Sequence, residues 1–309
     1  MDNILFVPST RETEWVQGVL PGTSPAELPV AGKRAIDYAM ERAQKFGVMF
    51  TEVLDWHFSE KLADEFADMT RTGFPVFYMK GEGTVPKGLR DVEGYSSPLT
   101  SNVTDGLVVV WGLAISTHSA EDLTLTPLSD EECADTPAGL YRREGGRWMR
   151  ITPHGLVVRS VKAWHELNFL VLRNPEDFTL PGYSSERDVH LGRSVVMEYG
   201  TDVKPPVLLN DNSWLARNVR LNGDVVVDSG SYISEGASLR RTVVCRDTFI
   251  GAGLDLDGKI VSGRRVIDAE TGTWVDLEEP GLARRIPHGL GWVRKVWHFL
   301  RGRSVGRRG

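Results

Sequence analysis

The sequence contains only two cysteines, Cys133 and Cys245, and no long uninterrupted apolar segment. The cysteines lie far apart and match no metal-binding spacing, which excludes a disulfide scaffold and a cysteine-ligated zinc site. No apolar run reaches the roughly 20 residues that a membrane-spanning helix requires. The start, "MDNILFVPSTRE", has no basic region before its short apolar run and differs from a secretion signal. We therefore expect a protein of the reducing cytoplasm.

Acidic residues are missing from the end of the chain. Residues 281–309 include eight Lys or Arg and no Asp or Glu, whereas the first 280 residues carry 28 basic and 42 acidic side chains. An acidic body with a basic tail predicts a separate partner for the tail, and it disfavours nucleic acid as that partner. Residues 289–302 can form a helix with one aromatic-aliphatic side and one basic side.

Two roles for this tail remain open. A helix of that kind suits an anionic membrane surface, which would place the protein at the inner face of the membrane. The tail could also cover an exposed sheet end, because such ends invite aggregation.

The length of 309 residues allows two modest domains, and 41% hydrophobic and 25% charged residues are ordinary values for a globular protein. In the first half, apolar runs at 3–8, 48–54, 74–79 and 106–115 predict strands. Segments 34–46 and 160–172 predict amphipathic helices, so this half is expected to be an α/β sheet of parallel strands. Hairpins are predicted at 141–151, with Gly145-Gly146 in the turn, and at 264–279, with Thr271-Gly272 in the turn.

The second half has a period of six residues. A strict six fits neither a helix nor a single strand, but it fits a three-sided parallel β-helix in which each side takes six residues. One residue is dropped between the ninth and tenth positions of the series, and the twelve positions predict about four coils. The repeated aliphatic positions are Leu191, Met197, Val203, Leu209, Leu215, Leu221, Val227, Ile233, Leu239, Val244, Ile250 and Leu256.

Three stretches together carry a family resemblance: "LPVAGKRAIDYAMERAQKFGV" (28–48), "SVKAWHELN" (160–168) and the six-residue repeats. With them the chain resembles the sugar-phosphate nucleotidyltransferases (NDP-sugar pyrophosphorylase-like), and more closely the members with an appended left-handed β-helix of hexapeptide repeats. The resemblance implies an α/β nucleotidyltransferase domain of the glycosyltransferase-A type over residues 1–183. A left-handed parallel β-helix (184–263), a β-hairpin extension (264–280) and the basic tail (281–309) follow.

The reaction of that family joins a sugar-1-phosphate to the α-phosphate of a nucleoside triphosphate and releases pyrophosphate. It depends on positioning and on neutralising charge, through a glycine-rich loop, basic side chains and a Mg²⁺ ion held by aspartate. The family's loop, Gly-x-Gly-Thr-Arg, falls here on Val7 to Arg11. Thr10 and Arg11 match, but neither glycine is present, and Pro8 lacks the N–H that a phosphate cradle uses.

Two further parts of that machinery are missing. The Lys expected before "LPV" falls on Pro25, and the Gly-Asp metal pair falls on Gly112-Leu113. Loss of one preorganised donor costs roughly a hundred- to a thousandfold in rate, so transfer should be nearly abolished. We therefore expect a degenerate protein of nucleotide-sugar or polysaccharide biosynthesis that binds a nucleotide or sugar nucleotide, or docks onto an envelope glycosyltransferase.

Several residues are candidates for a retained site. Thr10 and Arg11 come from the altered loop, Lys33 and Gly112 from motif positions, and Gly83, Thr84 and Lys87 from the loop "KGEGTVPKGLR" after a strand. Asp55 and Asp105 flank strands and are candidates for a metal. Arg142, Arg143, Arg147 and Arg150 could meet phosphates or form an exposed face.

Two alternatives to the degenerate protein remain. The first is an active nucleotidyltransferase with replacement residues, in which Arg11 would be catalytic and Mg²⁺ the cofactor. The second is a hexapeptide acyltransferase, for which His190 is the only histidine beside the coils that could act as general base. Repeats of this kind also predict a homo-oligomer, either a trimer or a dimer with coils side by side.

Overall fold

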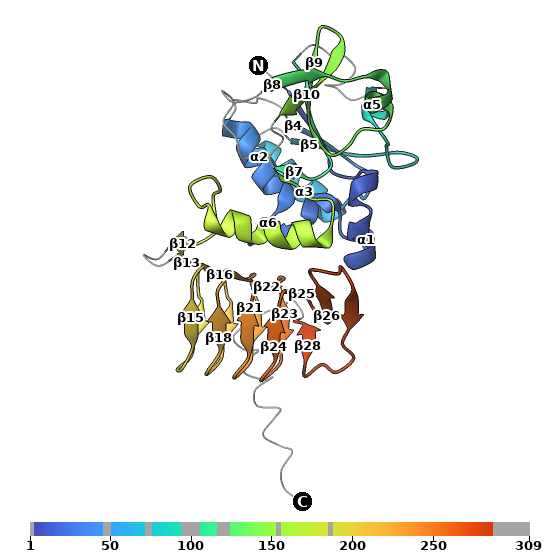
Figure 1. Ribbon diagram of the computed structural model, residues 1–309. Coiled ribbons are helices and arrows are strands. Elements are labelled where there is room, and N and C mark those ends of the chain that lie inside the picture. The colour runs from blue at the N-terminus through green and yellow to red at the C-terminus, as the bar shows by residue number, and fades with distance from the viewer. Residues whose placement is uncertain are drawn as a thin grey trace, which may run out of the picture. The chain divides into compact units, whose positions relative to one another are not determined.

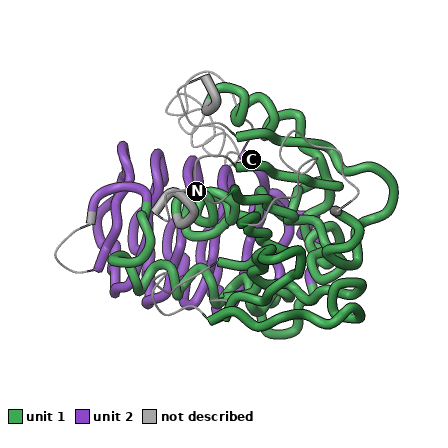
Figure 2. Tube along the Cα trace, turned by 90° about the horizontal axis from the view of Figure 1, so that it is seen from above, with its two compact units in different colours: residues 1–180, 268–273 green, residues 181–267, 274–309 purple. Residues whose placement is uncertain are grey.

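A computed structural model describes residues 3–45, 51–71, 76–93, 106–115, 124–152, 156–184 and 188–286 (Figure 1). The chain forms two compact units, residues 1–180 with 268–273 and residues 181–267 with 274–309 (Figure 2). Within the described ranges, no helix combines the length and the apolar character needed to cross a bilayer.

A mixed seven-stranded sheet lies at the centre of the first unit, in the order β5-β4-β1-β6-β9-β10-β8. Strands β5, β4, β1 and β6 run parallel, and β9, β10 and β8 join them antiparallel. The α/β prediction is thus confirmed, while the expected parallel order holds only for one side of the sheet. The strands are β1 (Ile4–Val7), β4 (Thr51–Asp55), β5 (Val76–Lys80), β6 (Val108–Trp111), β8 (Thr124–Pro127), β9 (Gly139–Glu144) and β10 (Arg147–Thr152).

Helices and two small strand pairs complete the first unit. Helix α2 (Ala35–Lys45) and α6 (Val161–Arg173) confirm the two helices predicted from periodicity. The others are α1 (Trp15–Val19), α3 (Glu60–Arg71), α4 (Leu89–Glu93), α5 (Asp130–Ala134) and the 3₁₀ turns η1 (Arg11–Thr13) and η2 (Pro25–Glu27). The small pairs are β2 (Pro29–Val30) with β3 (Lys33–Arg34), and β7 (Ala114–Ile115) with β11 (Leu156–Val157).

Strand β1 is buried on both faces, as its unbroken apolar sequence predicts. Ile4 and Phe6 join one core, which includes Ile36 and Met40 of α2 and Phe66 of α3. The alternate residues of β1 join a second core on the opposite face. This strand therefore anchors the sheet and holds the loop that follows it in place.

Two of the three stretches that carry the resemblance, residues 28–48 and 160–168, contact one another. The indole Nε1 of Trp164 in α6 donates to the carbonyl oxygen of Pro29 (2.6 Å), and Asn168 Oδ1 accepts from the Ala31 N–H (2.7 Å). The Tyr38 hydroxyl also donates to the Ala31 carbonyl (3.2 Å). Ala31 has a φ of 40°, a backbone conformation that these bonds hold. Both stretches therefore have a structural role in this fold.

The second unit consists mainly of short parallel strands in three sheets, as a β-helix would have them. The first sheet has β12 (Tyr183–Ser184), β13 (Val189–Leu191), β16 (Val207–Leu209), β19 (Val225–Val227), β22 (Thr242–Val244) and β25 (Lys259–Ser262). The second has β14 (Val196–Met197), β17 (Trp214–Leu215), β20 (Tyr232–Ile233) and β23 (Thr248–Ile250). The third has β15 (Asp202–Lys204), β18 (Arg220–Asn222), β21 (Ser238–Arg240) and β24 (Asp255–Asp257).

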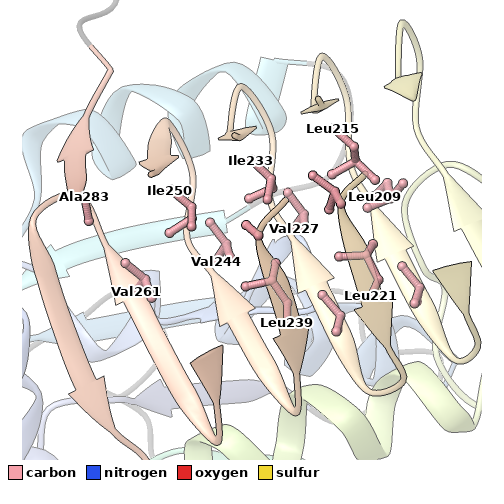
Figure 3. Close-up of a cluster of buried hydrophobic side chains, with 14 residues drawn as sticks. Leu209, Leu215, Leu221, Val227, Ile233, Leu239, Val244, Ile250, Val261 and Ala283 are labelled. Atoms are coloured by element: carbon pink, nitrogen blue, oxygen red, sulfur yellow. The ribbon is translucent and has the colours of Figure 1, made fainter. Parts of the chain in front are cut away.

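The strand register confirms the six-residue period. Leu191 lies opposite Leu209, three repeats later, and Leu209 lies opposite Val227. Val227 then lies opposite Val244, so the dropped residue falls between β19 and β22 as the sequence indicates. The repeated side chains from Leu209 to Ile250 stack into one aliphatic interior, in which Leu221 and Ile233 are fully buried (Figure 3).

The corners of this unit have a second regularity. A residue with positive φ recurs three positions before every repeated aliphatic residue except Leu209, beginning with Asp188, Ser194 and Gly200, and Pro206 takes that place before Leu209. The side chains at these corners are mostly Gly, Asn, Asp or Ser, the types that adopt the left-handed conformation at low cost. Arg241, with a φ of 43°, differs from these residue types and lies in the corner between Leu239 and Val244, where the repeat is one residue shorter.

The last described segments close the stack at its C-terminal end. Strands β26 (Arg265–Asp268) and β27 (Trp274–Asp276) form the predicted hairpin, and Gly272 in its turn has a φ of 70°. Strand β28 (Ala283–Arg285) pairs antiparallel with β23, and Ala283 joins the aliphatic interior. The first residues of the basic tail are therefore part of the stack, while residues 287–309 lie outside the described residues.

Candidate functional site

The carboxyl ends of β1, β4, β5 and β6 form the edge of the sheet where a ligand site is expected. The chain passes from β1 to β4 and β5 on one side, and then places β6 on the other side of β1. Open α/β sheets bind ligands at such a reversal, beyond the carboxyl ends of the strands. The loops that begin at Pro8, Trp56, Gly81 and Gly112 lie at this edge.

Asp55, the last residue of β4, is the centre of a buried polar cluster at this edge. Its side chain is fully buried. Its carboxylate accepts four hydrogen bonds, from the hydroxyls of Ser9, Ser24 and Tyr78 and from the backbone N–H of His57. The bonds from Tyr78 and from His57 are each 3.0 Å long. These donors replace the water that a buried carboxylate loses, and they join four separate segments of the first unit.

The Ser9 hydroxyl connects this carboxylate to His57. Ser9 Oγ lies 2.9 Å from His57 Nδ1. A carboxylate only accepts, so Ser9 donates to Asp55, and Nδ1 of His57 must then carry a proton and donate to Ser9. His57 is partly exposed as a residue, and Nε2 is the ring nitrogen that this bond leaves for solvent or a ligand. Burial and the Asp55 carboxylate raise the pKa of the neighbouring Tyr78 phenol, which stays protonated.

The loop after β1 is closed by its own hydrogen bonds. The Thr10 N–H donates to Thr13 Oγ1 (2.9 Å), and that hydroxyl donates to the Pro8 carbonyl (2.9 Å). Ser9 and Thr10 are 0% and 2% exposed. A phosphate cradle needs several free backbone N–H groups that face one point, whereas here one is bonded internally and Pro8 has none.

Arg11 and Lys33 both point to carboxylates of this chain. The Arg11 guanidinium is exposed and lies 3.9 Å from Asp135. Lys33 Nζ forms an ion pair with Glu41 of α2 and lies 5.3 Å from the centre of the Tyr38 ring. Neither side chain is directed at the Asp55 cluster by any contact in the described part of the chain.

The end of β6 is apolar where the family would hold a metal ion. Gly112 has a φ of 71°, and a Cβ there would meet Ala138 Cβ at 2.8 Å and Thr10 Oγ1 at 3.4 Å. A cavity of about 20 Å³ lies beside it, lined by Phe6, Pro8, Ile36, Val110 and Leu113 among other apolar residues. Thr10 Oγ1 is buried without a hydrogen-bond partner in the described residues. This crevice provides room for about one water molecule.

A magnesium site does not fit the described residues of this edge. Asp55 is surrounded by O–H and N–H donors, which would have to leave before a cation could bind. No group of three or more His, Cys, Asp or Glu side chains with metal-site geometry occurs in the described ranges. Asp105 lies outside them.

Aromatic rings extend the site from β4 toward β5. The Phe58 ring stacks on Tyr78, with centroids 4.8 Å apart and an interplanar angle of 15°. The Trp56 indole covers Gly81, whose Cβ position would be 2.3 Å from the ring, and Nε1 donates to the Glu82 carbonyl (3.2 Å). A larger residue at position 81 would displace the indole, so Gly81 fixes Trp56 beside the following loop.

That loop holds the candidate residues Gly83, Thr84 and Lys87, all of them exposed. The backbone N–H of Lys87 donates to Asp91 (2.7 Å), which orders the loop and leaves the ammonium group in solvent. Arg90 instead pairs with Asp130 (2.8 Å). The structure thus places Lys87 on the same edge as His57 and Trp56, while Arg11 and Lys33 are engaged elsewhere.

The remaining candidates lie away from this cluster. Arg150 pairs with Glu132 (2.7 Å), Arg142 with Glu144 (3.2 Å), and Arg143 lies over the Trp148 ring. His190 is in β13 of the second unit and is 4% exposed, and burial lowers its pKa while Asp188 opposes that shift. A general base must reach a substrate proton, which this burial does not favour.

Sequence reasoning missed most of this site. It considered Asp55 for a metal and did not connect it with Ser24, Tyr78, His57 or Trp56. The signal was the polar and aromatic run "DWHF" directly after an apolar strand, since strand ends of a parallel sheet share one edge. The serines could not be predicted as partners, because their segments come together only in the fold. The chain matches no protein-family model and no curated protein sequence.

Proposed function

We propose that this protein is a non-catalytic, nucleotidyltransferase-like binding protein of nucleotide-sugar or polysaccharide biosynthesis, with a left-handed β-helix as its second unit. One observation carries the proposal: in the loop after β1, the Ser9 hydroxyl is bonded to Asp55, and the Thr10 N–H and the Thr13 hydroxyl are bonded within the loop. A triphosphate and its metal ion would have to break that arrangement before transfer could occur. The arrangement favours a protein that binds without reacting.

The ligand proposed for this edge is a nucleotide or sugar nucleotide. Trp56 and Phe58 each pack one ring face within the chain, on Gly81 and on Tyr78, and the proposal assigns their other faces to a planar base. Stacking of a base on an aromatic ring contributes about 1–3 kcal/mol. Lys87 and the Nε2 side of His57 offer charge or hydrogen bonds to phosphate. The described residues thus supply parts for binding, in positions that differ from the loop of the resembling family.

The first experiment tests for turnover. The full-length protein is incubated with each nucleoside triphosphate, Mg²⁺ and a panel of sugar-1-phosphates, and released pyrophosphate is measured. We expect no turnover. A rate of even a few per second would overturn the proposal and favour an active enzyme with replacement residues.

The second experiment tests for the pocket. Thermal shift and calorimetry with nucleotides and nucleotide sugars should show binding that does not require Mg²⁺, and Lys87→Ala should weaken it about tenfold. Trp274→Ala, an exposed aromatic of the second unit, is the matched control and should leave binding unchanged. Absence of binding by every nucleotide would contradict the ligand while leaving the loss of catalysis intact.

The basic tail supports a proposal of docking to an anionic membrane surface or an envelope glycosyltransferase. Because β28 belongs to the stack, the shortened protein should keep Ile286 as its last residue, since a protein cut at Gly281 would also lose β28. Removal of residues 287–309 should abolish co-sedimentation with anionic vesicles and leave the melting temperature unchanged. A lower melting temperature with unchanged vesicle binding would instead favour the tail as a cover for the stack.

A further inference from the structure

The N-terminal end of the strand stack has two edge strands that no strand of the described chain covers. Strands β14 and β15 are the first members of their sheets, whereas β13 is covered by β12. Figure 1 shows β15 as the first of the row β15, β18, β21 and β24. An uncovered edge strand is a template for pairing with another chain.

The backbone groups that face this edge follow from the bonds on the inner side. The Val196 N–H donates to the backbone carbonyl of Ser213 (3.0 Å), and the Asp202 N–H donates to the backbone carbonyl of Val219 (2.9 Å). Both bonds point toward the next coil. Successive residues of a strand point their N–H and C=O groups to opposite sides. The N–H and C=O groups of Met197 and Val203 therefore point to the free edge.

Apolar side chains gather at the same end. Tyr199, Tyr183 and Met197 are 90%, 75% and 47% exposed. Met197 occupies a repeated aliphatic position, whose equivalents in the next coils, Leu215 and Ile233, are fully buried. The stack thus ends on a layer that lacks the covering coil its own repeat would provide.

The charges on β15 indicate which chain pairs with its free edge. We propose that two copies of this chain pair antiparallel through β15, with the two-fold axis at Val203. Val203 of each copy then exchanges both N–H···O bonds with Val203 of the other, and Asp202 lies opposite Lys204 on both sides. Cross-strand pairs of opposite charge stabilise a sheet, and both side chains are more than half exposed in one copy.

The other end of the same sheet carries the opposite pattern. Strand β24 reads Asp255-Leu256-Asp257, so the same two-fold pairing there would place Asp255 opposite Asp257. Like charges directly opposite one another destabilise a strand pair. Pairing through β15 alone closes after two copies and does not continue into a filament. This inference is independent of the nucleotide site.

Charge reversal at β15 tests the pairing. Sedimentation velocity of the full chain over a range of concentrations should show a monomer–dimer equilibrium. Asp202→Lys places lysines opposite one another, Lys204→Asp places aspartates opposite one another, and each should raise the dimer dissociation constant by about tenfold. The double variant Asp202→Lys/Lys204→Asp restores opposite charges and should restore the dimer.

Asp255→Lys on β24 is the matched control and should leave the dimer unchanged. Circular dichroism and melting temperature establish that each variant is folded, since these side chains are exposed. A protein that stays monomeric at all concentrations would overturn the proposal. So would a dimer or trimer that both single reversals leave intact, because that assembly must use another surface.

Discussion

The strand stack and the carboxyl edge of the α/β sheet achieve burial in opposite ways. In the stack, one pattern recurs from coil to coil, with an aliphatic side chain inside and a left-handed residue at every corner but that of Pro206. At the edge, Asp55 collects donors from four segments, and each contact occurs once. A residue pattern that recurs in every coil can be recognised in one sequence, whereas a set of contacts that occurs once cannot.

Replacement of Asp55 gives the largest expected effect. Asp55→Ala leaves the buried hydroxyls of Ser9, Ser24 and Tyr78 without their acceptor, and we expect a loss of about 4 kcal/mol in the free energy of unfolding. Asp55→Asn keeps one acceptor oxygen, and hydroxyls can reverse their direction, so it should cost about half as much. Urea denaturation measures both. Equal losses would show that charge, and not acceptor geometry, holds the cluster.

Truncation within the stack should cost somewhat less. Leu215→Ala removes a fully buried side chain between two layers, and we expect a loss of about 3 kcal/mol. Met197→Ala is the matched control, because Met197 occupies the same column one coil earlier and is 47% exposed. It should change stability by less than about 1 kcal/mol at concentrations where the chain is monomeric. Similar losses at both positions would contradict an open N-terminal end.

Much of the fold could be predicted because it depends on local patterns. The apolar run of β1, the glycine pair of the β9–β10 hairpin and the period of the coils each specify one element. The corner residues were also readable, since Asn212, Asn218 and Asp224 recur at the same spacing of six.

For the candidate site, the sequence predicted only which features of the resembling family are absent. Missing glycines and a leucine at position 113 predict the absence of the phosphate loop and metal site that the resemblance implies, and that prediction stays untested. The structure shows a loop after β1 with internal hydrogen bonds and an apolar crevice beside Gly112. What replaces them depends on contacts between residues far apart in the chain, such as Ser24 with Asp55. Arg11 matched a motif position, but its side chain points to Asp135.

Alkaline pH provides a weaker test of burial in the first unit. Burial raises the pKa of Tyr141 to about 12, and it also raises that of Tyr78. In the unfolded chain both tyrosines ionise at pH ~10, so above this pH the unfolded state binds fewer protons than the native state and stability falls with rising pH. The slope should be about 1.4 kcal/mol per pH unit for each tyrosine that stays protonated in the fold.

Denaturation at pH values between about 9 and 11 measures that slope. Tyr141→Phe should make it shallower, and Tyr183→Phe, at an exposed position, is the control that should not. An unchanged slope in Tyr141→Phe would mean that the phenol reaches solvent in the native state.

The smallest effect concerns the corners of the stack. Gly236 has a φ of 73° with no atom within 4 Å of its Cβ position, whereas Gly230 has a φ of 71° with Asp247 Oδ1 at 2.4 Å. Gly236→Ala therefore reports the cost of the left-handed conformation alone, about 1 kcal/mol. Gly230→Ala adds the displacement of Asp247 and should cost more in the same denaturation measurement. If both cost the same, conformation alone selects the corner residues. If Gly230→Ala costs more, contact between neighbouring coils also restricts which residue types occupy the corners. The residue type at a corner then depends on packing between coils as well as on the six-residue spacing.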